Sequence, residues 1–413
     1  MILVDGGTLV CCALARSQFR TVAWLKLRMF ALIIGIVFIS TLGSTSVPIP
    51  NENDGILWNI TFELNSTYNT LGQPRVYHVT YPSKDIYTNV PVIMHFHGGN
   101  GEASSAAVST QLVAKAAPLG FMTVFAEGYL MSSGGRKWSG GSCCGECAAN
   151  VSCSCYINDV QYVSGVIQGL VETEYIREDN PVFASGHSNG GIMSYRLYCE
   201  LGDKISGIAV AESFNGYYDA GQCLVDCNSD DHLCYSNSTP GCSEEIWTTA
   251  LPEFFPCSKE NVPSNSILSF QGSKDIHVLI DGGACTDETR CAAHGTSYVP
   301  YNFQVNYNAI LNGCDMNLPA TKTFRNESSV DENDTSECFS YQGCTKNTTY
   351  CIQYNGGHTW PGKQYDQCDE NSDSYNAVEC AYLQWYVGPT ITSLHATELL
   401  VDFFKMLMDH KDY

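Results

Sequence analysis

Short apolar runs alternate through the middle of the chain with longer segments in which apolar residues recur every three or four positions. The short runs predict β-strands and the longer segments predict helices, and their alternation is typical of a mostly parallel sheet covered on both faces. We therefore predict an α/β fold. The expected strands lie at residues 90–96, 121–125, 182–185, 205–211, 267–270 and 350–354. The expected helices lie at 160–175, at 192–201 and in the alanine-rich stretch between the first two strands.

Two further patterns predict how the sheet begins and how the chain closes. Residues 57–64 and 75–81 alternate apolar and polar side chains, which predicts an antiparallel pair at one edge of the sheet. Residues 396–408 carry their leucines and phenylalanines on one side, which predicts a closing amphipathic helix that packs on the sheet.

Turn-rich, cysteine-containing insertions separate these elements. They lie at about 217–262, 281–300, 312–348 and 363–393. Loops of this length inside a compact domain are usually functional, as lids or binding walls, and surface decoration is the alternative for each of them. Because the chain shows no internal repeat and no linker, we expect residues 47–413 to form a single domain.

Residues 1–46 have the organisation of a targeting segment. Four basic residues precede the apolar run 29–39, and small residues follow at 43–46, which predicts a signal peptide. The apolar run is shorter than the ~20 residues that span a bilayer, and a retained signal anchor is the alternative. The basic region is long, so Met29 is a second candidate for the start of the chain.

Cysteine usage agrees with export. Two of the 21 cysteines lie in the leader and the other 19 lie between Cys143 and Cys380, which predicts a disulfide framework in an oxidising compartment with at least one thiol left over. Metal binding through pairs such as Cys144 and Cys147 is the alternative, but no regular four-ligand spacing with histidines follows. Seven N-x-[ST] sequons predict glycosylation, at Asn59, Asn65, Asn150, Asn237, Asn326, Asn333 and Asn347.

The charge balance narrows the possible partners. The chain carries 21 Lys and Arg residues against 43 Asp and Glu residues, a formal net charge of −22, which disfavours nucleic acid and anionic lipid. With the leader removed, we expect a soluble extracellular protein with no membrane partner.

The segment from Gly186 to Gly190 has the form G-x-S-x-G and lies between a predicted strand and a predicted helix. This form is typical of a nucleophile elbow, in which a serine occupies a strained turn that leaves no room for side chains two residues to either side. Ser188 is therefore the candidate nucleophile. The pentapeptide also occurs by chance, so its value depends on partners elsewhere in the chain.

A serine alcohol needs a histidine base, and the histidine needs a carboxylate that fixes its tautomer. In the fold that uses such an elbow, the acid and then the base follow the serine along the chain. Asp275 lies in a turn after a predicted strand, and His358 lies in a glycine-rich loop after another. We therefore assign Asp275 as the acid and His358 as the base, with Asp281 and Asp287 as alternatives for the acid.

The tetrahedral intermediate of acyl transfer needs backbone N–H donors where its negative charge develops. We expect one donor from Asn189, directly after the nucleophile, whose side chain has no part in this role. We expect the second from Gly99, in the loop His97-Gly98-Gly99 that follows an early strand. A plain tight turn is the alternative for that loop.

These motifs together resemble those of the secreted polyhydroxybutyrate depolymerase-like esterases, a group of α/β-hydrolases that includes feruloyl and acetylxylan esterases. The resemblance covers roughly residues 57–408. It is carried by His97-Gly98-Gly99, Trp138 with Gly141-Ser142-Cys143-Cys144-Gly145, Asn158-Asp159-Val160, Gly186-His187-Ser188-Asn189-Gly190-Gly191, Gly272-Ser273-Lys274-Asp275 and Gly357-His358-Thr359-Trp360-Pro361-Gly362.

The resemblance implies an α/β-hydrolase catalytic domain over residues 47–413, and it gives the same roles to Ser188, Asp275 and His358. Two departures bear on the substrate. Members of the family usually have two aspartates where this chain has Asn158-Asp159, and a polar or cysteine residue often follows the first His-Gly where Gly99 stands here. The cysteine-rich insertions also exceed the usual pattern.

Two tryptophans are candidates for flat apolar walls around an aromatic or polymeric acyl group: Trp360, next to the base, and Trp138, near two cysteines. Core packing is the alternative for both rings. His97, at the head of the glycine loop, is the third candidate for substrate binding. Adjacent Cys143 and Cys144 are expected to pair with different partners and to hold this loop near the site.

The sequence therefore predicts a secreted, glycosylated serine esterase that works through an acyl-enzyme without a metal or an organic cofactor. Its expected substrates are small-molecule or polymer-linked carboxylic esters: feruloyl or acetyl esters of plant or algal polysaccharide first, then polyhydroxybutyrate-type polyesters. A hydrolase-like binding protein without catalysis and a serine peptidase of the same fold are the alternatives.

Overall fold

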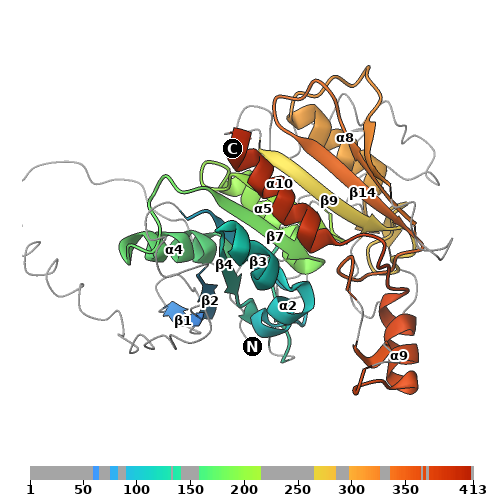
Figure 1. The fold of residues 1–413 in the computed structure, drawn as a ribbon, viewed down its shortest axis with the longest axis horizontal. Coiled ribbons are helices and arrows are strands. Elements are labelled where there is room, and N and C mark those ends of the chain that lie inside the picture. Colours follow the sequence, from blue (N-terminus) through green and yellow to red (C-terminus); the bar gives the residue numbers. More distant parts are fainter. Residues whose placement is uncertain are drawn as a thin grey trace, which may run out of the picture. The chain divides into compact units, whose positions relative to one another are not determined.

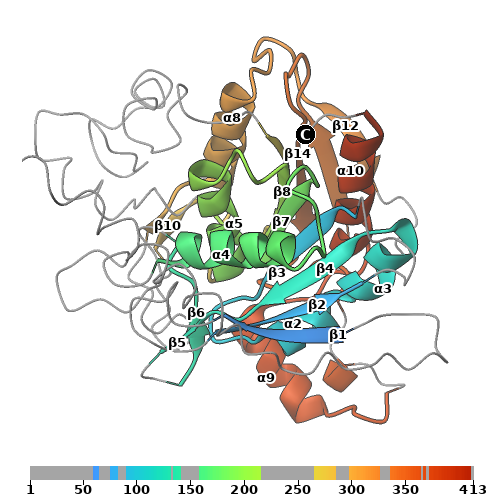
Figure 2. The ribbon, with the colours of Figure 1, turned by 90° about the vertical axis from the view of Figure 1, so that its left-hand side faces the viewer.

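A ten-stranded sheet runs through the described part of the chain in this computed structural model (Figures 1 and 2), with the order β1-β2-β4-β3-β7-β8-β9-β14-β13-β12. All structural statements below concern residues 59–64, 75–81, 90–131, 134–140, 158–214, 265–284, 297–325, 335–363, 366–368 and 372–410, which belong to one compact unit. The strands are β1 (Asn59–Leu64), β2 (Arg75–Thr80), β3 (Val92–Phe96), β4 (Met122–Ala126), β7 (Val182–His187), β8 (Gly207–Ala211), β9 (Ser266–Gly272), β12 (Thr321–Arg325), β13 (Thr335–Ser340) and β14 (Thr348–Tyr354).

The centre of the sheet is parallel. Strands β4, β3, β7, β8, β9 and β14 pair in parallel, and their carboxyl ends therefore share one edge of the sheet. At one side β2 and β1 add antiparallel, as the sequence predicts. At the other side β13 and β12 add antiparallel, and Cys338 of β13 is joined by a disulfide to Cys351 of β14.

Alternate residues of the central strands enter two apolar clusters on opposite faces. On β3, Val92 and Met94 belong to one cluster, with residues of the helices at 159–172, 189–200 and 301–311, whereas Ile93 belongs to the other, with residues of the helices at 103–110, 112–116 and 396–410. Both faces are buried, which explains why apolar residues predominate on both faces of these strands. The helices and short hairpins are α2 (Ala103–Thr110), α3 (Leu112–Ala116), η2 (Ala117–Leu119), α4 (Asp159–Glu172), α5 (Asn189–Glu200), α8 (Tyr301–Leu311), η4 (Asp366–Cys368), α9 (Ala377–Val387), α10 (Ala396–His410), β5 (Tyr129–Leu130) with β6 (Arg136–Lys137), and β10 (Gly283–Ala284) with β11 (Ser297–Tyr298).

The expected α/β fold and the closing helix α10, which packs on β8 and β9, are confirmed. The segments expected as loops contain more regular structure than predicted. Part of the insertion 312–348 forms β12 and β13, and the insertion 363–393 contains α9. Helix α8 was also missed, because its buried side includes the polar Gln304 and Asn308, both of which donate to the Tyr195 hydroxyl group. The segment 217–262 lies outside the described residues.

A buried ion pair ties β2 to α4. The guanidinium of Arg75 pairs with Asp159, donates to the carbonyl oxygen of Glu127 and lies 3.6 Å from the ring centroid of Tyr162. The second carboxylate oxygen of Asp159 accepts a hydrogen bond from the Ser139 N–H at 2.6 Å. The pair explains why an aspartate stands at this position of the Asn158-Asp159 motif.

Asn158 has a different task, because its side chain caps α4 by accepting from the N–H of Gln161 at 3.0 Å. Aspartate and asparagine both cap helices well, so the departure from the usual two aspartates leaves the local structure intact.

Replacing Asp159 with alanine should lower the free energy of unfolding by about 3–5 kcal/mol, because Arg75 would be left buried without its counter-ion. Urea unfolding followed by circular dichroism measures the loss. Asp179→Ala is the matched control, because Asp179 pairs with Arg177 at the surface and its removal should leave stability almost unchanged. Equal stabilities for the two variants would contradict a structural role for the buried pair.

Candidate active site

Ser188 occupies the turn between β7 and α5 with φ 53° and ψ −123°, a backbone conformation that an L-residue rarely adopts. The glycines around it are required by close backbone contacts. A Cβ at Gly190 would lie 2.0 Å from the carbonyl oxygen of Phe96, and one at Gly186 would lie 2.3 Å from the carbonyl carbon of Gly190. A Cβ at Gly191 would meet Ser213 Oγ at 2.3 Å. The turn is therefore wedged between the ends of β3 and β8.

Asp275 and His358 follow β9 and β14, neighbouring parallel strands, and the structure brings them together. His358 Nδ1 lies 2.7 Å from Asp275 Oδ2. Asp275 also accepts hydrogen bonds from the N–H groups of His277 at 2.7 Å and Val278 at 2.8 Å, and from Gln271 Nε2 at 3.3 Å. Burial alone would raise the pKa of Asp275, but His358 and these hydrogen bonds hold it below its ordinary value. Asp281, an alternative acid, is exposed in the turn that follows, and Asp287 lies outside the described residues.

The contact with Asp275 directs Nδ1 of His358 toward the carboxylate and leaves Nε2 on the other side of the ring. The ring of His187, the residue before Ser188, lies 5.0 Å from the His358 ring. No hydrogen bond joins Ser188 and His358 in the structure. Such contacts are often long without substrate, and the two residues lie on adjacent loops at the same edge of the sheet.

The end of α9 holds the histidine loop through main-chain atoms. The N–H of His358 donates to the carbonyl oxygen of Val387 at 2.5 Å, and His277 Nε2 lies 2.8 Å from the carbonyl oxygen of Tyr386. A Cβ at Gly357 would lie 2.3 Å from the Val387 oxygen, which explains the second glycine of the Gly-Gly-His motif. Helix α9 thus helps to place the imidazole.

The loop Gly98-Gly99 lies against the elbow. A Cβ at Gly98 would lie 3.6 Å from the Cβ of Ser188, and one at Gly99 would lie 3.7 Å from the Cβ of Asn189. Among the described residues, neither the N–H of Gly99 nor that of Asn189 has a hydrogen-bond acceptor. Both expected donors therefore border Ser188.

His97, a candidate for substrate binding, contacts the backbone of the glycine loop and of Gly128. It is 2% exposed, its Nδ1 lies 2.7 Å from the carbonyl oxygen of Gly98, and its Nε2 accepts from the N–H of Gly128 at 2.9 Å. These contacts fit a neutral ring that donates from Nδ1. Burial lowers the pKa of His97 to about 4, which agrees with that tautomer.

The two tryptophans, which are candidates for apolar walls of the substrate site, are buried, as their alternative role in core packing requires. Trp138 is 0% exposed and packs edge to face on Phe96, and its Nε1 donates to the carbonyl oxygen of His97 at 3.0 Å. Trp360 is 5% exposed, and its Nε1 donates to Thr397 Oγ1 at 2.9 Å. Each ring therefore supports a loop of the site from behind.

The side chain of Asn189 has a structural role that the sequence analysis did not assign. Its Oδ1 accepts from the N–H of Trp138 at 2.7 Å, and its Nδ2 donates to the carbonyl oxygen of Trp138 at 2.9 Å. The carboxamide thereby satisfies both backbone groups of one buried residue. This pair of bonds ties the segment around Trp138 to the start of α5.

Burial keeps two further histidines near the site neutral. Burial lowers the pKa of His95 to about 3, with a smaller contribution from His97. Burial also lowers the pKa of His187 well below its ordinary value, and the neighbouring His358 acts in the same direction. These two neutral imidazole rings therefore add no positive charge near Ser188.

The structure adds a buried carboxyl group, Glu212, that the sequence analysis missed. It follows β8 directly, and its side chain contacts that of Asp275. The signal that identified Asp275, an acidic residue at the end of a predicted strand, was also present at Glu212. A catalytic triad needs one acid, so this signal alone does not assign a role to Glu212.

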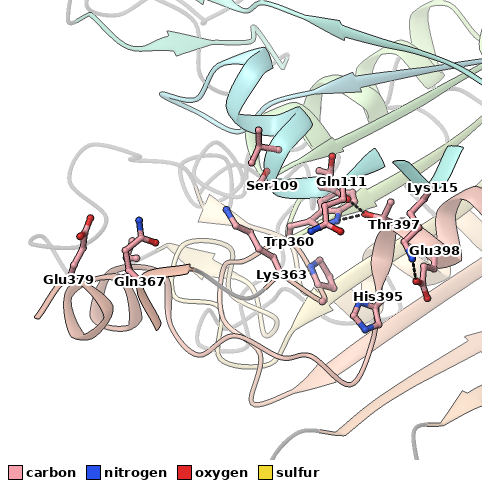
Figure 3. Close-up of a pocket in the computed structure, with 15 residues that line it drawn as sticks. Ser109, Gln111, Lys115, Trp360, Lys363, Gln367, Glu379, His395, Thr397 and Glu398 are labelled. Atoms are coloured by element: carbon pink, nitrogen blue, oxygen red, sulfur yellow. Dashed lines mark hydrogen bonds and ion pairs between the residues drawn. The ribbon is translucent and has the colours of Figure 1, made fainter. Parts of the chain in front are cut away.

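A cavity of about 720 Å³ lies beyond the histidine loop and includes none of the three assigned residues (Figure 3). Its walls come from α2, α3, α9, α10 and the segment Trp360–Lys363. The ion pair between Lys115 and Glu398 lies on one wall, and Trp360 separates the cavity from His95 and His187.

Disulfides join Cys314 to Cys344, Cys338 to Cys351 and Cys368 to Cys380 in the described ranges. Cys143 and Cys144 lie outside these ranges, and so do all the sequons except Asn59 and Asn347. No described helix is long and apolar enough to cross a membrane. Within the same ranges no cluster of three or more His, Cys, Asp or Glu side chains could hold a metal ion.

The strand order, with the elbow after the central strand β7 and the acid and base after β9 and β14, defines an α/β-hydrolase fold. Neither a protein family model nor a curated protein sequence matches the chain.

Solved structures similar to the chain include acetyl xylan esterase from Aspergillus awamori, at 11% identity and a TM-score of 0.46, covering 73% of this chain and 94% of that one. An S-formylglutathione hydrolase from Agrobacterium tumefaciens has 14% identity and a TM-score of 0.38, covering 55% and 79%. One from Staphylococcus aureus has 15% identity and a TM-score of 0.35, covering 54% and 82%. At these values none of the three identifies the activity of this chain.

Replacing Asn189 with alanine should lower the free energy of unfolding by about 2–4 kcal/mol, because two buried backbone groups of Trp138 would lose their partners. Chemical denaturation measures the change. Asn317→Ala is the control, because within the described ranges the Asn317 side chain bonds only to Asp315, in an exposed turn. A variant as stable as the wild type would mean that the carboxamide does not hold this segment.

Proposed function

We propose that this protein is a secreted, glycosylated serine esterase that hydrolyses carboxylic esters through an acyl-enzyme. The observation that carries the proposal is the bond between His358 and Asp275 at the sheet edge where the strained Ser188 turn lies. Ser188, Asp275 and His358 follow one another along the chain in the order that this fold uses for acyl transfer, and each lies after a strand of the sheet. The adjacent Gly98-Gly99 loop also favours acyl transfer.

In this mechanism, His358 Nε2 takes the proton of Ser188 as Oγ attacks the ester carbonyl carbon. Asp275 holds the ring through Nδ1 and stabilises the imidazolium that forms. The N–H groups of Gly99 and Asn189 donate to the oxyanion. His358 returns the proton to the leaving alcohol, and then activates the water that releases the acid from Ser188.

The three disulfides of the described ranges support secretion, since such bonds persist in oxidising compartments. The proposed leader, residues 1–46, and the seven sequons complete this part of the proposal.

A row of aromatic rings supports a substrate that extends beyond the ester group. The His277 ring lies 4.8 Å from the ring of His358, and the Tyr386 ring lies 5.0 Å from that of His277. On the same helix, Tyr382 is 57% exposed and Trp385 is 45% exposed. Aromatic faces bind sugar rings and aromatic acyl groups well. We therefore favour feruloyl or acetyl esters carried on polysaccharide, ahead of polyhydroxybutyrate-type polyesters.

Ser188→Ala should lower kcat for p-nitrophenyl acetate by about 10⁶-fold and abolish covalent labelling by a fluorophosphonate probe. Ser109→Ala is the control, because Ser109 lies on α2 and, among the described residues, its hydroxyl group bonds only to the carbonyl oxygen of Ala106. Turnover that persists in the Ser188 variant would remove this residue from the mechanism. A wild type that neither reacts with the probe nor hydrolyses any ester would favour the binding role.

Tyr382→Ala combined with Trp385→Ala should raise KM for acetylated xylan while leaving kcat/KM for p-nitrophenyl acetate unchanged, because the small ester does not reach α9. The wild type should be compared on methyl ferulate, acetylated xylan and a hydroxybutyrate oligomer. Equal rates on all three, or an unchanged KM in the double variant, would argue against recognition of a polysaccharide.

A further inference from the structure

Glu212 is fixed between the elbow and the acid. Its φ of 49° lies in the left-handed region, which a glutamate rarely occupies, and its side chain is 0% exposed. The N–H of Glu212 donates to the carbonyl oxygen of Phe270 at 3.0 Å, and the preceding carbonyl, of Ala211, accepts from the N–H of Ser188 at 2.9 Å. Backbone strain at this position marks a side chain whose direction matters.

The carboxyl group of Glu212 has three partners. One oxygen accepts from the N–H of Gly272 at 2.8 Å, and the other accepts from Gln353 Nε2 at 3.0 Å. The carboxyl group of Asp275 is its neighbour: Gly272, whose N–H donates to Glu212, also accepts from the N–H of Asp275 at 3.3 Å, and the two carboxyl groups interact electrostatically. A hydrogen bond between two carboxyl groups requires a proton on one of them.

The surroundings decide which group holds that proton. Asp275 faces four donors, from His358, His277, Val278 and Gln271, whereas Glu212 faces two. Two ionised carboxylates in contact would repel each other, so the group with fewer donors keeps the proton. Burial, followed by the nearby charge of Asp275, raises the pKa of Glu212 well above its ordinary value, in agreement with this assignment.

We propose that Glu212 is a positioning residue whose protonated carboxyl group donates a hydrogen bond to Asp275 and so fixes the carboxylate that orients His358. This inference rests on the proposed esterase mechanism for its kinetic consequence only. The titratable groups that face Glu212 are Asp275, with His358 beyond it, and Tyr301 of α8, whose hydroxyl group also bonds to Ser269. In the proposed mechanism, the protonated glutamate therefore acts on the serine through the aspartate and the histidine.

The kinetic test compares two replacements of Glu212. Glu212→Leu removes the donor and should lower kcat for p-nitrophenyl acetate by about 10²-fold with little change in KM, because Asp275 and His358 lose their fixed position. Glu212→Gln keeps an N–H donor for Asp275, and Gln353 can turn its Oε1, which has no partner among the described residues, toward the new amide. The Gln variant should therefore stay near the wild-type kcat. Equal losses in both variants would overturn the proposal.

A second test needs no activity. A carboxyl group whose pKa is raised by folding stabilises the fold below its unfolded pKa, near 4.5, and this contribution is lost as the pH rises toward the folded pKa. The Gln variant does not titrate at this position, so its Tm relative to wild type should increase from pH 5 to pH 8. Glu172→Gln, an exposed substitution on α4, should show no such trend.

A Tm difference that stays constant with pH for Glu212→Gln would mean that Glu212 is ionised in the folded protein and would overturn the proposal. Failure of the wild type to hydrolyse any ester would overturn the proposed function instead, and the pH dependence of Tm would still decide the state of Glu212.

Discussion

The contact of backbone on backbone at the nucleophile turn is the constraint on which the rest of the site depends. Gly190 touches the end of β3, Gly191 touches the segment after β8, and neither contact leaves space for a methyl group. Close packing of this kind cannot relax by rotating a side chain. It therefore fixes Ser188 relative to the glycine loop on one side and to Glu212 on the other.

The hydrogen-bond donors around each titratable side chain of the site determine which of these side chains carries a charge. The buried His95, His97 and His187 are neutral, and the four donors around Asp275 make it the favoured position for negative charge. In a mechanism that forms an imidazolium, a carboxylate that protein donors hold in a fixed position lowers the free energy needed to form that cation. The protonated state proposed for Glu212 supplies one more donor without adding charge.

The sequence predicted those parts of the molecule whose pattern is local. Apolar runs identified the central strands, and residues at strand ends identified Asp275 and His358, because parallel strands bring their carboxyl ends together. Helices α8 and α9 escaped prediction, since α8 buries amides and α9 buries no side chain at all. The sequence left two roles open for the tryptophans, because an aromatic residue near a catalytic motif looks the same whether it faces the substrate or the core. The two bonds from Asn189 to Trp138 join residues 51 positions apart, and no local pattern encodes them.

Helix α9 contacts the histidine loop through the carbonyl oxygens of Tyr386 and Val387, while its exposed side chains point away from any core. Main-chain carbonyls are the same for every amino acid. The identity of the outward residues of α9 is therefore free to change, provided that the last turn of the helix ends at the same place. The exposed side chains of α9 can therefore change with little effect on the position of the His358 imidazole. This makes α9 a suitable place for changes of substrate, in evolution or by engineering.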